Sequence, residues 1–308
     1  MILPVTGFQY TNKNRLGERM KKIVIIVMPM LILCKPVKID EILTERNTFR
    51  IDTSISYTNI QRTNGSIAPI EYQTQNGDFV TIPTFVGDSK SNQDYINYGF
   101  ILRYGISKNI EAFSLLNLYT SDTHFSNTEG FNTKSEKGFD SLILGLTYQI
   151  KPENDTPSLL IGTNIDAIDK TNFSGTDKNI NFKGYTFFAT SYYTVDPIVF
   201  LINTSYRYNL EKKYKNNSIK NAKQLSISPQ VFFAVNPYTS LSTGIKYTYK
   251  GTTKIDNIQV NSSGSSMTYL LGVSYEINAK TTLNIDADYS NDMGISQNSF
   301  SMGLSYKF

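Results

Sequence analysis

The chain has 308 residues, of which 30 are Lys or Arg and 26 are Asp or Glu, so its formal net charge is only +4. A charge this small and dispersed argues against a nucleic-acid partner. One cysteine and one histidine exclude a disulfide framework and any metal site built from several residues of either type. Tyr, Phe and uncharged polar residues are abundant, and charged residues make up only 18% of the chain. This composition favours β-structure and is unlike that of an ordinary soluble enzyme.

The N-terminal part of the chain carries the pattern of an export signal. Met20 is followed by two lysines and by the apolar run 23–33, which has the length of a signal-peptide core and is too short to span a membrane as a helix. Met20 is therefore predicted to be the true start. The predicted parts of the chain are an upstream extension or mis-assigned start (1–19), a signal peptide (20–34), a short periplasmic lead or plug (35–48) and a strand-rich remainder (49–308).

Twelve segments of the remainder alternate apolar and polar residues. In the last of them Phe300, Met302 and Leu304 share one face, and serines and a glycine occupy the other. A period of two with one apolar face predicts strands of a sheet with a single polar side, each about as long as a tilted strand needs to cross a bilayer. The predicted strands are 49–60, 95–106, 110–120, 139–150, 158–168, 182–194, 198–210, 225–236, 240–250, 265–277, 281–291 and 299–308.

The connections between these segments are alternately long and short. Short turns such as 107–109 and 278–280 carry turn-forming residues, whereas the long connections are rich in Asn, Lys, Ser and Gly. An up-and-down barrel in an outer membrane sorts its loops in this way, with short periplasmic turns and long external loops, and a β-sandwich does not. Unpaired backbone groups are costly in hydrocarbon, so the sheet has to close. We therefore predict an all-β fold, a transmembrane up-and-down antiparallel β-barrel of about 12 strands in the bacterial outer membrane.

Tyrosines and the C-terminal residues support a membrane location. Ten tyrosines lie near strand ends on the apolar face, where interfacial aromatic girdles are found: Tyr57, Tyr104, Tyr148, Tyr206, Tyr208, Tyr247, Tyr249, Tyr275, Tyr289 and Tyr306. Tyr306 and Phe308 end the last strand in the manner of the C-terminal signal that the barrel-assembly machinery reads. The expected partners are this machinery, outer-membrane lipid and lipopolysaccharide, and a small-molecule solute.

The connection 61–94 is the longest and is not expected to be structureless. Segments 67–72 and 79–85 flank Asn76-Gly77, which is a strong hairpin signal. An extension of the external wall is favoured over a hairpin folded inward as a constriction.

Charged residues on the polar face are the candidates for a lumen lining. They could select the solute, or they could pair across the lumen and fill a polar interior; since both signs are present in comparable number, pairing is favoured. Among these candidates, Asp286 and Asp288 stand out because their two carboxylates share one face of one predicted strand. Closure of the barrel should bring Arg50 and Lys307, from the first and last strands, together. The lumen-lining candidates are Arg50, Asp52, Arg103, Asp166, Arg207, Lys246, Lys250, Glu276, Asp286, Asp288 and Lys307.

Part of the chain is similar to a known family. Residues 102–107, followed by Ile110 and Glu111, and the stretch from Gly138 through 144–148 resemble the outer-membrane transporter family named for the meta-pathway of phenol degradation. The resemblance covers about 95–308 and implies passage of small molecules, aromatic or apolar ones included. It supplies no binding residues.

An enzymatic alternative rests on the sequence His124-Phe125-Ser126-Asn127. This H-x-S-N pattern is similar to that of outer-membrane lipid hydrolases, in which a His activates a Ser and a third residue orients the His; Glu129, Asn132 or Glu136 could be that third residue. Because the motif is expected in a polar loop past the strand, the enzyme is disfavoured. The favoured function is a non-enzymatic channel or transporter that works by passive diffusion without a cofactor; an adhesin or structural barrel and a soluble exported β-sandwich are weaker alternatives.

Overall fold

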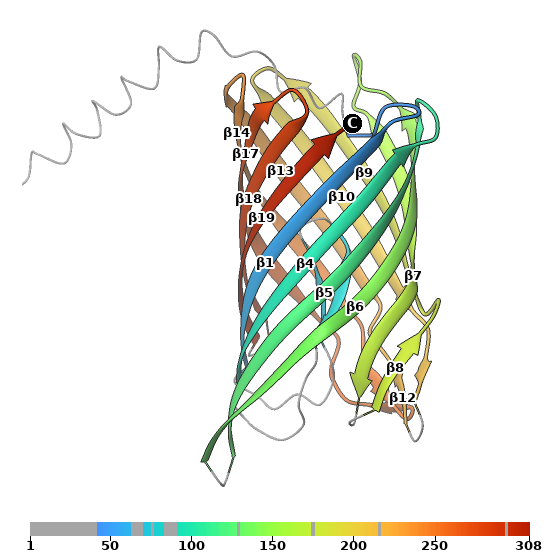
Figure 1. Ribbon diagram of the computed structural model, residues 1–308, viewed down its shortest axis with the longest axis vertical. Helices are drawn as coiled ribbons and strands as arrows, with labels where there is room; N and C mark the ends of the chain where they lie inside the picture. The colour runs from blue at the N-terminus through green and yellow to red at the C-terminus, as the bar shows by residue number, and fades with distance from the viewer. Residues whose placement is uncertain are drawn as a thin grey trace, which may run out of the picture.

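Twelve antiparallel strands form a closed barrel (Figure 1). The computed structural model describes residues 42–62, 70–74, 77–82, 91–127, 130–173, 176–214, 217–292 and 295–308; the predicted extension, signal peptide and first part of the lead lie outside these residues. No helix in the described part of the chain is long and apolar enough to cross a membrane. In ring order the strands are β1 (Phe49–Arg62), β4 (Ser91–Gly105), β5 (Ile110–Asn127), β6 (Gly130–Lys151), β7 (Leu159–Phe173), β9 (Gly184–Val195), β10 (Ile198–Asn209), β13 (Gln224–Asn236), β14 (Thr239–Lys250), β17 (Gly264–Asn278), β18 (Thr281–Asp292) and β19 (Ile295–Lys307).

The ring closes through strands far apart in the sequence. β1 pairs with β19 in one unbroken register, from Arg50 opposite Lys307 to Arg62 opposite Ile295. β6 pairs with β7, so every barrel strand has two neighbours and no edge faces lipid. All twelve predicted strands are present, and the predicted fold class is confirmed.

Several strands continue farther than their apolar alternation predicts. β5 and β6 pair through to Asn127 and Gly130, across residues expected to form a loop, and the resulting hairpin projects beyond the end opposite the short turns (Figure 1). The expectation of a loop was wrong because backbone pairing does not require a lipid-facing side chain: outside the bilayer a polar hairpin can extend the wall. Smaller elements lie at the same external end: β8 (Thr176–Ile180), β11 (Lys212–Lys213), β12 (Ser218–Lys220), β15 (Lys254–Ile255) and β16 (Ile258–Gln259).

The two faces of the wall differ as the alternation predicts. On β19 the side chains of Phe300 and Met302 are 52% and 49% exposed, whereas Ser299 and Ser305 are buried inside. The same outward apolar band runs over every barrel strand, which is the surface that lipid covers. Eight of the ten girdle tyrosines are exposed on it; Tyr104 and Tyr208 are half-buried.

A hairpin from the β1–β4 connection lies inside the barrel. Its strands are β2 (Ile70–Gln73) and β3 (Phe79–Ile82), shown in cyan within the ring in Figure 1. Tyr72, Val80 and Ile82 form a buried cluster with Ile60 of β1 and Tyr95 of β4. The predicted hairpin is confirmed by the pairing of β2 with β3, although Asn76 of its turn lies outside the described residues. The expected external wall extension was wrong, because the apolar side of the hairpin packs against the inner wall.

Candidate functional site: the barrel lumen

Polar side chains of the hairpin hold it to the far wall. Glu71 accepts hydrogen bonds from the side chains of Asn209 (2.6 Å) and Gln224 (3.3 Å), on β10 and β13. Arg207 Nη2 lies 3.6 Å from the other oxygen of Glu71. A carboxylate buried this deeply needs such partners, so Glu71 fixes where the hairpin can lie.

Arg207 is the centre of the charged cluster at this wall. It donates two hydrogen bonds to Asp166, at 2.9 and 2.5 Å, and both side chains are almost fully buried. Its guanidinium carbon lies 5.1 Å from the ring centre of Phe79 in β3. Gly184 is required beside the pair, since a Cβ there would overlap Asp166 and Arg207.

A second set of contacts ties the hairpin to further strands of the ring. The Tyr72 hydroxyl donates to Asp288 on β18 at 2.9 Å. Lys246 on β14 donates to the carbonyl of Gln73 at 3.3 Å, and the Gln73 amide donates to Ser205 at 3.0 Å. The hairpin thus bridges strands from both sides of the lumen.

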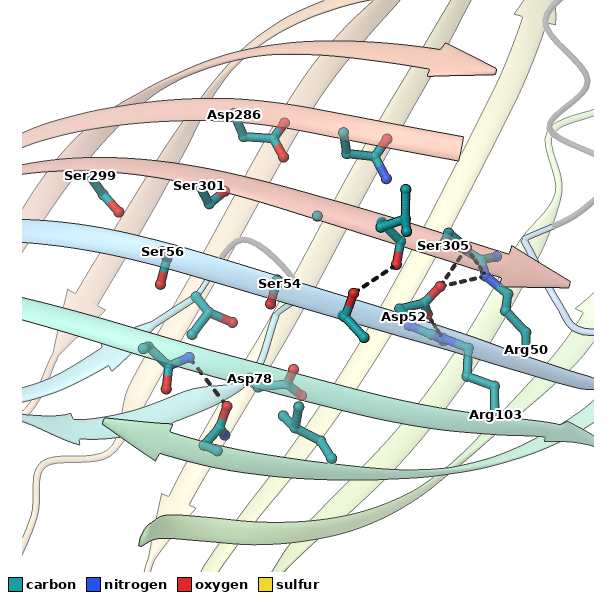
Figure 2. Close-up of a pocket in the computed structure, with 18 of the residues that line it drawn as sticks. Arg50, Asp52, Ser54, Ser56, Asp78, Arg103, Asp286, Ser299, Ser301 and Ser305 are labelled. Carbon is teal, nitrogen blue, oxygen red and sulfur yellow. Dashed lines mark hydrogen bonds and ion pairs between the residues drawn. The ribbon is translucent and has the colours of Figure 1, made fainter. Parts of the chain in front are cut away.

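Nearer the periplasmic end, a network of charges joins adjacent strands. Asp52 accepts hydrogen bonds from Arg50 (2.8 Å), Arg103 (2.7 Å) and Ser305 (2.5 Å). Arg103 also donates to Glu111 at 2.9 Å. Figure 2 shows Arg50, Asp52, Arg103 and Ser305 gathered over β1, β4 and β19.

The last part of the N-terminal lead enters the periplasmic mouth. The backbone N–H and the hydroxyl of Thr44 both donate to Glu111 Oε2 at 2.7 Å. Ile42 and Leu43 pack against a buried apolar cluster on the inner wall, made of Leu160, Tyr192 and Val199. Gly105 permits this approach, since a Cβ there would overlap the carbonyl oxygens of Thr44 and Glu45.

Between the charged network and the hairpin lies a cavity of about 120 Å³. Its walls come from β1, β4, β5, β18 and β19, and the hairpin turn contributes Thr74 and Asp78. Most of the lining is polar, with Ser54, Ser56, Asn97, Asn117, Asn284, Ser299 and Ser301 among it. The cavity is a polar compartment that a solute crossing the lumen would meet.

The predicted lumen residues fall into three groups. Most of them take part in the contacts described above: Arg50, Asp52, Arg103, Asp166, Arg207, Lys246 and Asp288. Asp286 lines the cavity. Lys250 and Lys307 stand at strand ends, opposite Gln224 and Arg50. Glu276, predicted to line the lumen, is exposed near the periplasmic end of β17, beside a register shift between β17 and β18. Selection of solutes by these charges stays a prediction.

Sequence reasoning missed several residues of the site. Glu71 and Asp78 lie in a loop that was expected outside, and Glu111 was read only as part of a family motif. Lys212 and Asp169, which form a buried ion pair at the external end, were also missed. Alternation along β5 could have placed Glu111 inside, because it shares the face of Leu115 and Asn117, but nothing local marks Glu71.

The hydrolase motif lies on a strand in the projecting hairpin rather than in the loop expected for it. His124 is exposed; its Nδ1 lies 2.9 Å from the Thr133 hydroxyl, and its Nε2 lies 3.9 Å from Asp94. Glu136, one proposed third member, pairs with Lys134 at 3.1 Å. The side chains of Ser126, Asn132 and Glu129 lie outside the described residues. Among the described residues, no three His, Cys, Asp or Glu side chains are grouped so as to hold a metal ion.

A closed ring of strands, a lipid-facing apolar band and a polar lumen define a bacterial outer-membrane β-barrel. The family described as outer membrane protein beta-barrel domain matches residues 142–308, and the chain belongs to it. No protein of curated function matches the chain.

Solved structures with the same architecture are distant in sequence. An outer membrane channel from Pseudomonas putida F1 is 12% identical with a TM-score of 0.61, over 87% of this chain and 98% of that one. The translocator domain of the autotransporter NalP from Neisseria meningitidis is 10% identical (TM-score 0.48; 95% and 96% covered), and the NanC porin is 13% identical (0.47; 84% and 100%). At these identities the likeness concerns the fold alone, and no argument rests on the latter two.

Proposed function

We propose that the protein is an outer-membrane channel that passes small molecules by passive diffusion. The observation that carries the proposal is the polar lumen cavity inside a closed, lipid-facing barrel. A purely structural barrel needs no such compartment, and the likeness to the channel from Pseudomonas putida F1 agrees with the proposal.

The inward hairpin β2–β3 is the constriction of this channel. It is held by hydrogen bonds and ion pairs to several strands, and its sequence is continuous with an external connection. A solute therefore passes beside the hairpin or when the hairpin shifts. The resting conductance is expected to be small.

The polar lining favours small polar solutes over aromatic hydrocarbons. Cavity walls of serine, asparagine, arginine and aspartate offer hydrogen bonds that an apolar solute cannot return, so such a solute would leave polar groups unsatisfied. The resemblance to the meta-pathway transporters implies that aromatic or apolar molecules pass as well. Block of single-channel conductance in a planar bilayer by glycerol and by phenol compares the two classes, because block requires that the solute enter the lumen.

Swelling of vesicles that contain the refolded protein tests the channel. We expect slow glycerol entry with the wild type and several-fold faster entry when residues 70–82 are replaced by a short Gly-Ser linker. Removing residues 126–131 at the tip of the projecting β5–β6 hairpin is the matched control, since this tip extends beyond the last pair between β4 and β5. Equal, protein-independent swelling in all three samples would refute the proposal.

A further inference from the structure

Two carboxylates that line the lumen cavity are left without a hydrogen-bonded or ion-paired partner among the described residues. Asp78, at the turn of the inward hairpin, is only 5% exposed, and Asp286 on β18 is half-buried. Neither carboxylate accepts a hydrogen bond or forms an ion pair with any of the described residues. In Figure 2 both stand away from the Arg50–Asp52–Arg103 cluster, and no dashed line reaches them.

The nearby arginines are already neutralised by other acids. Arg50 and Arg103 share Asp52, and Arg103 also binds Glu111. Arg207, on the opposite wall, binds Asp166 in a bidentate pair. The cavity therefore carries an excess of negative charge that its own side chains do not balance.

An unpaired buried carboxylate is costly, and proteins ordinarily pair such groups or neutralise them. Asp78 is the sharper case, because it is buried at the end of a hairpin whose position is fixed by Glu71 and Tyr72. Hydroxyls of Ser54, Ser299 and other serines surround the cavity and supply neutral acceptors. Its volume of about 120 Å³ is close to that of the engineered cavities that hold a small organic molecule.

We propose that this cavity, whose lining includes Asp78 and Asp286, is a subsite for a small organic cation, a primary ammonium compound. An ammonium group has three N–H donors, which the carboxylates and serine hydroxyls of the lining can accept, and hydrogen bonds to ionised groups are the strong ones. This inference rests on the proposed channel and names the class of solute that the channel prefers.

Binding is expected to depend on pH. Burial raises the pKa of Asp78 to about 7, against the opposing pull of Arg103 and Arg207 and with repulsion from Asp166. The charged groups that face the same cavity are Arg50, Asp52, Arg103 and Asp286. Because the cation binds only the ionised carboxylate, affinity should rise as pH increases through about 7 and fall below it.

Calorimetric titration of the refolded full-length protein with ethylammonium chloride tests the subsite. We expect saturable binding, at least about tenfold weaker in the variant Asp78→Asn/Asp286→Asn and in Asp286→Asn alone, since each variant removes a charge-assisted contact. Asp155→Asn, on the exposed β6–β7 turn, removes the same charge elsewhere and should bind like the wild type. Only variants that keep the heat-modifiable gel mobility of a folded barrel are compared, and Asp286→Asn alone decides the result if the double variant does not fold.

The inference would be overturned if the wild type and the cavity variants bound ethylammonium equally well, or if the neutral isostere ethanol bound as well as ethylammonium. It would also be overturned if calcium chloride displaced ethylammonium at concentrations lower than that of ethylammonium, because the site would then be one for an inorganic ion. Glycerol entry is measured separately on the wild type. Binding without entry would refute the channel and keep the subsite, and entry without binding would refute the subsite alone.

Discussion

Replacing Arg207 with alanine is expected to destabilise the barrel and to loosen the inward hairpin. The guanidinium is 2% exposed, binds Asp166 through two hydrogen bonds and lies 3.6 Å from Glu71. Its removal leaves the buried carboxylates of Asp166 and Glu71 without their guanidinium partner. Breaking a buried ion pair by removing one partner costs about 3–5 kcal/mol, so a loss of this size in unfolding free energy is expected.

Urea titration of the protein refolded in lipid vesicles measures this loss, with the fraction of folded barrel read from the mobility of unheated samples on gels. Arg207→Lys should recover only part of it, because a single ammonium cannot reproduce the bidentate pair. Arg46→Ala, at an exposed position in the lead, is the matched control and should change stability by less than about 0.5 kcal/mol. Faster glycerol entry should accompany the Arg207 variant, since Glu71 loses one of its anchors.

A change of less than about 1 kcal/mol in Arg207→Ala would refute this reasoning. It would mean that water reaches Asp166 and Glu71 once the guanidinium is gone, so that burial in the lumen does not isolate these charges. Replacing Arg207 and Asp166 together by Met and Leu should destabilise less than Arg207→Ala alone, because no unpaired charge is left on the wall at that pair.

Three further predictions follow from single contacts. Burial raises the pKa of Asp78 to about 7, so ionisation of this carboxyl destabilises the folded state as pH rises from about 4 to 7. In urea titrations, Asp78→Asn should therefore be more stable than the wild type at pH 8 and no more stable than the wild type at pH 4. Gly105→Val places carbon atoms where the carbonyls of the lead lie, so the lead should leave the periplasmic mouth and single-channel conductance in a planar bilayer should rise; unchanged conductance would show that the lead does not limit flow. Ser126→Ala and His124→Ala should leave glycerol entry unchanged, and neither wild type nor variants should release fatty acid from phospholipid vesicles; release by the wild type that Ser126→Ala abolishes would establish the hydrolase instead.

Much of the wall could be predicted because alternation is a local property. Whether Phe300 faces lipid and Ser299 faces the lumen depends only on their parity within one strand, since the side chains of a strand alternate between its two faces. Turn residues gave the same kind of local signal for the Asn76-Gly77 hairpin. The end of the lipid-facing pattern was mistaken for the end of the strand at β5, because pairing continues beyond the bilayer.

The contents of the lumen could not be predicted in this way. Glu71 meets Asn209 and Gln224 only after the ring has closed, across more than a hundred residues of sequence. The sequence of the loop does not indicate whether its apolar side packs outside the barrel or, as observed, against Ile60 and Tyr95 on the inner wall. The donors that match Glu71 of the hairpin, Asn209 and Gln224, lie on the far wall of the closed ring.

The sequence by itself determined the strands, the two faces of the wall and the outer-membrane location, because each follows from a period of two and from the cost of unpaired backbone in lipid. The tertiary structure alone decided that the hairpin and the lead enter the lumen, which charges neutralise one another, and that Asp78 and Asp286 are left over. Those outcomes depend on distances across a closed ring, and no short stretch of sequence contains them.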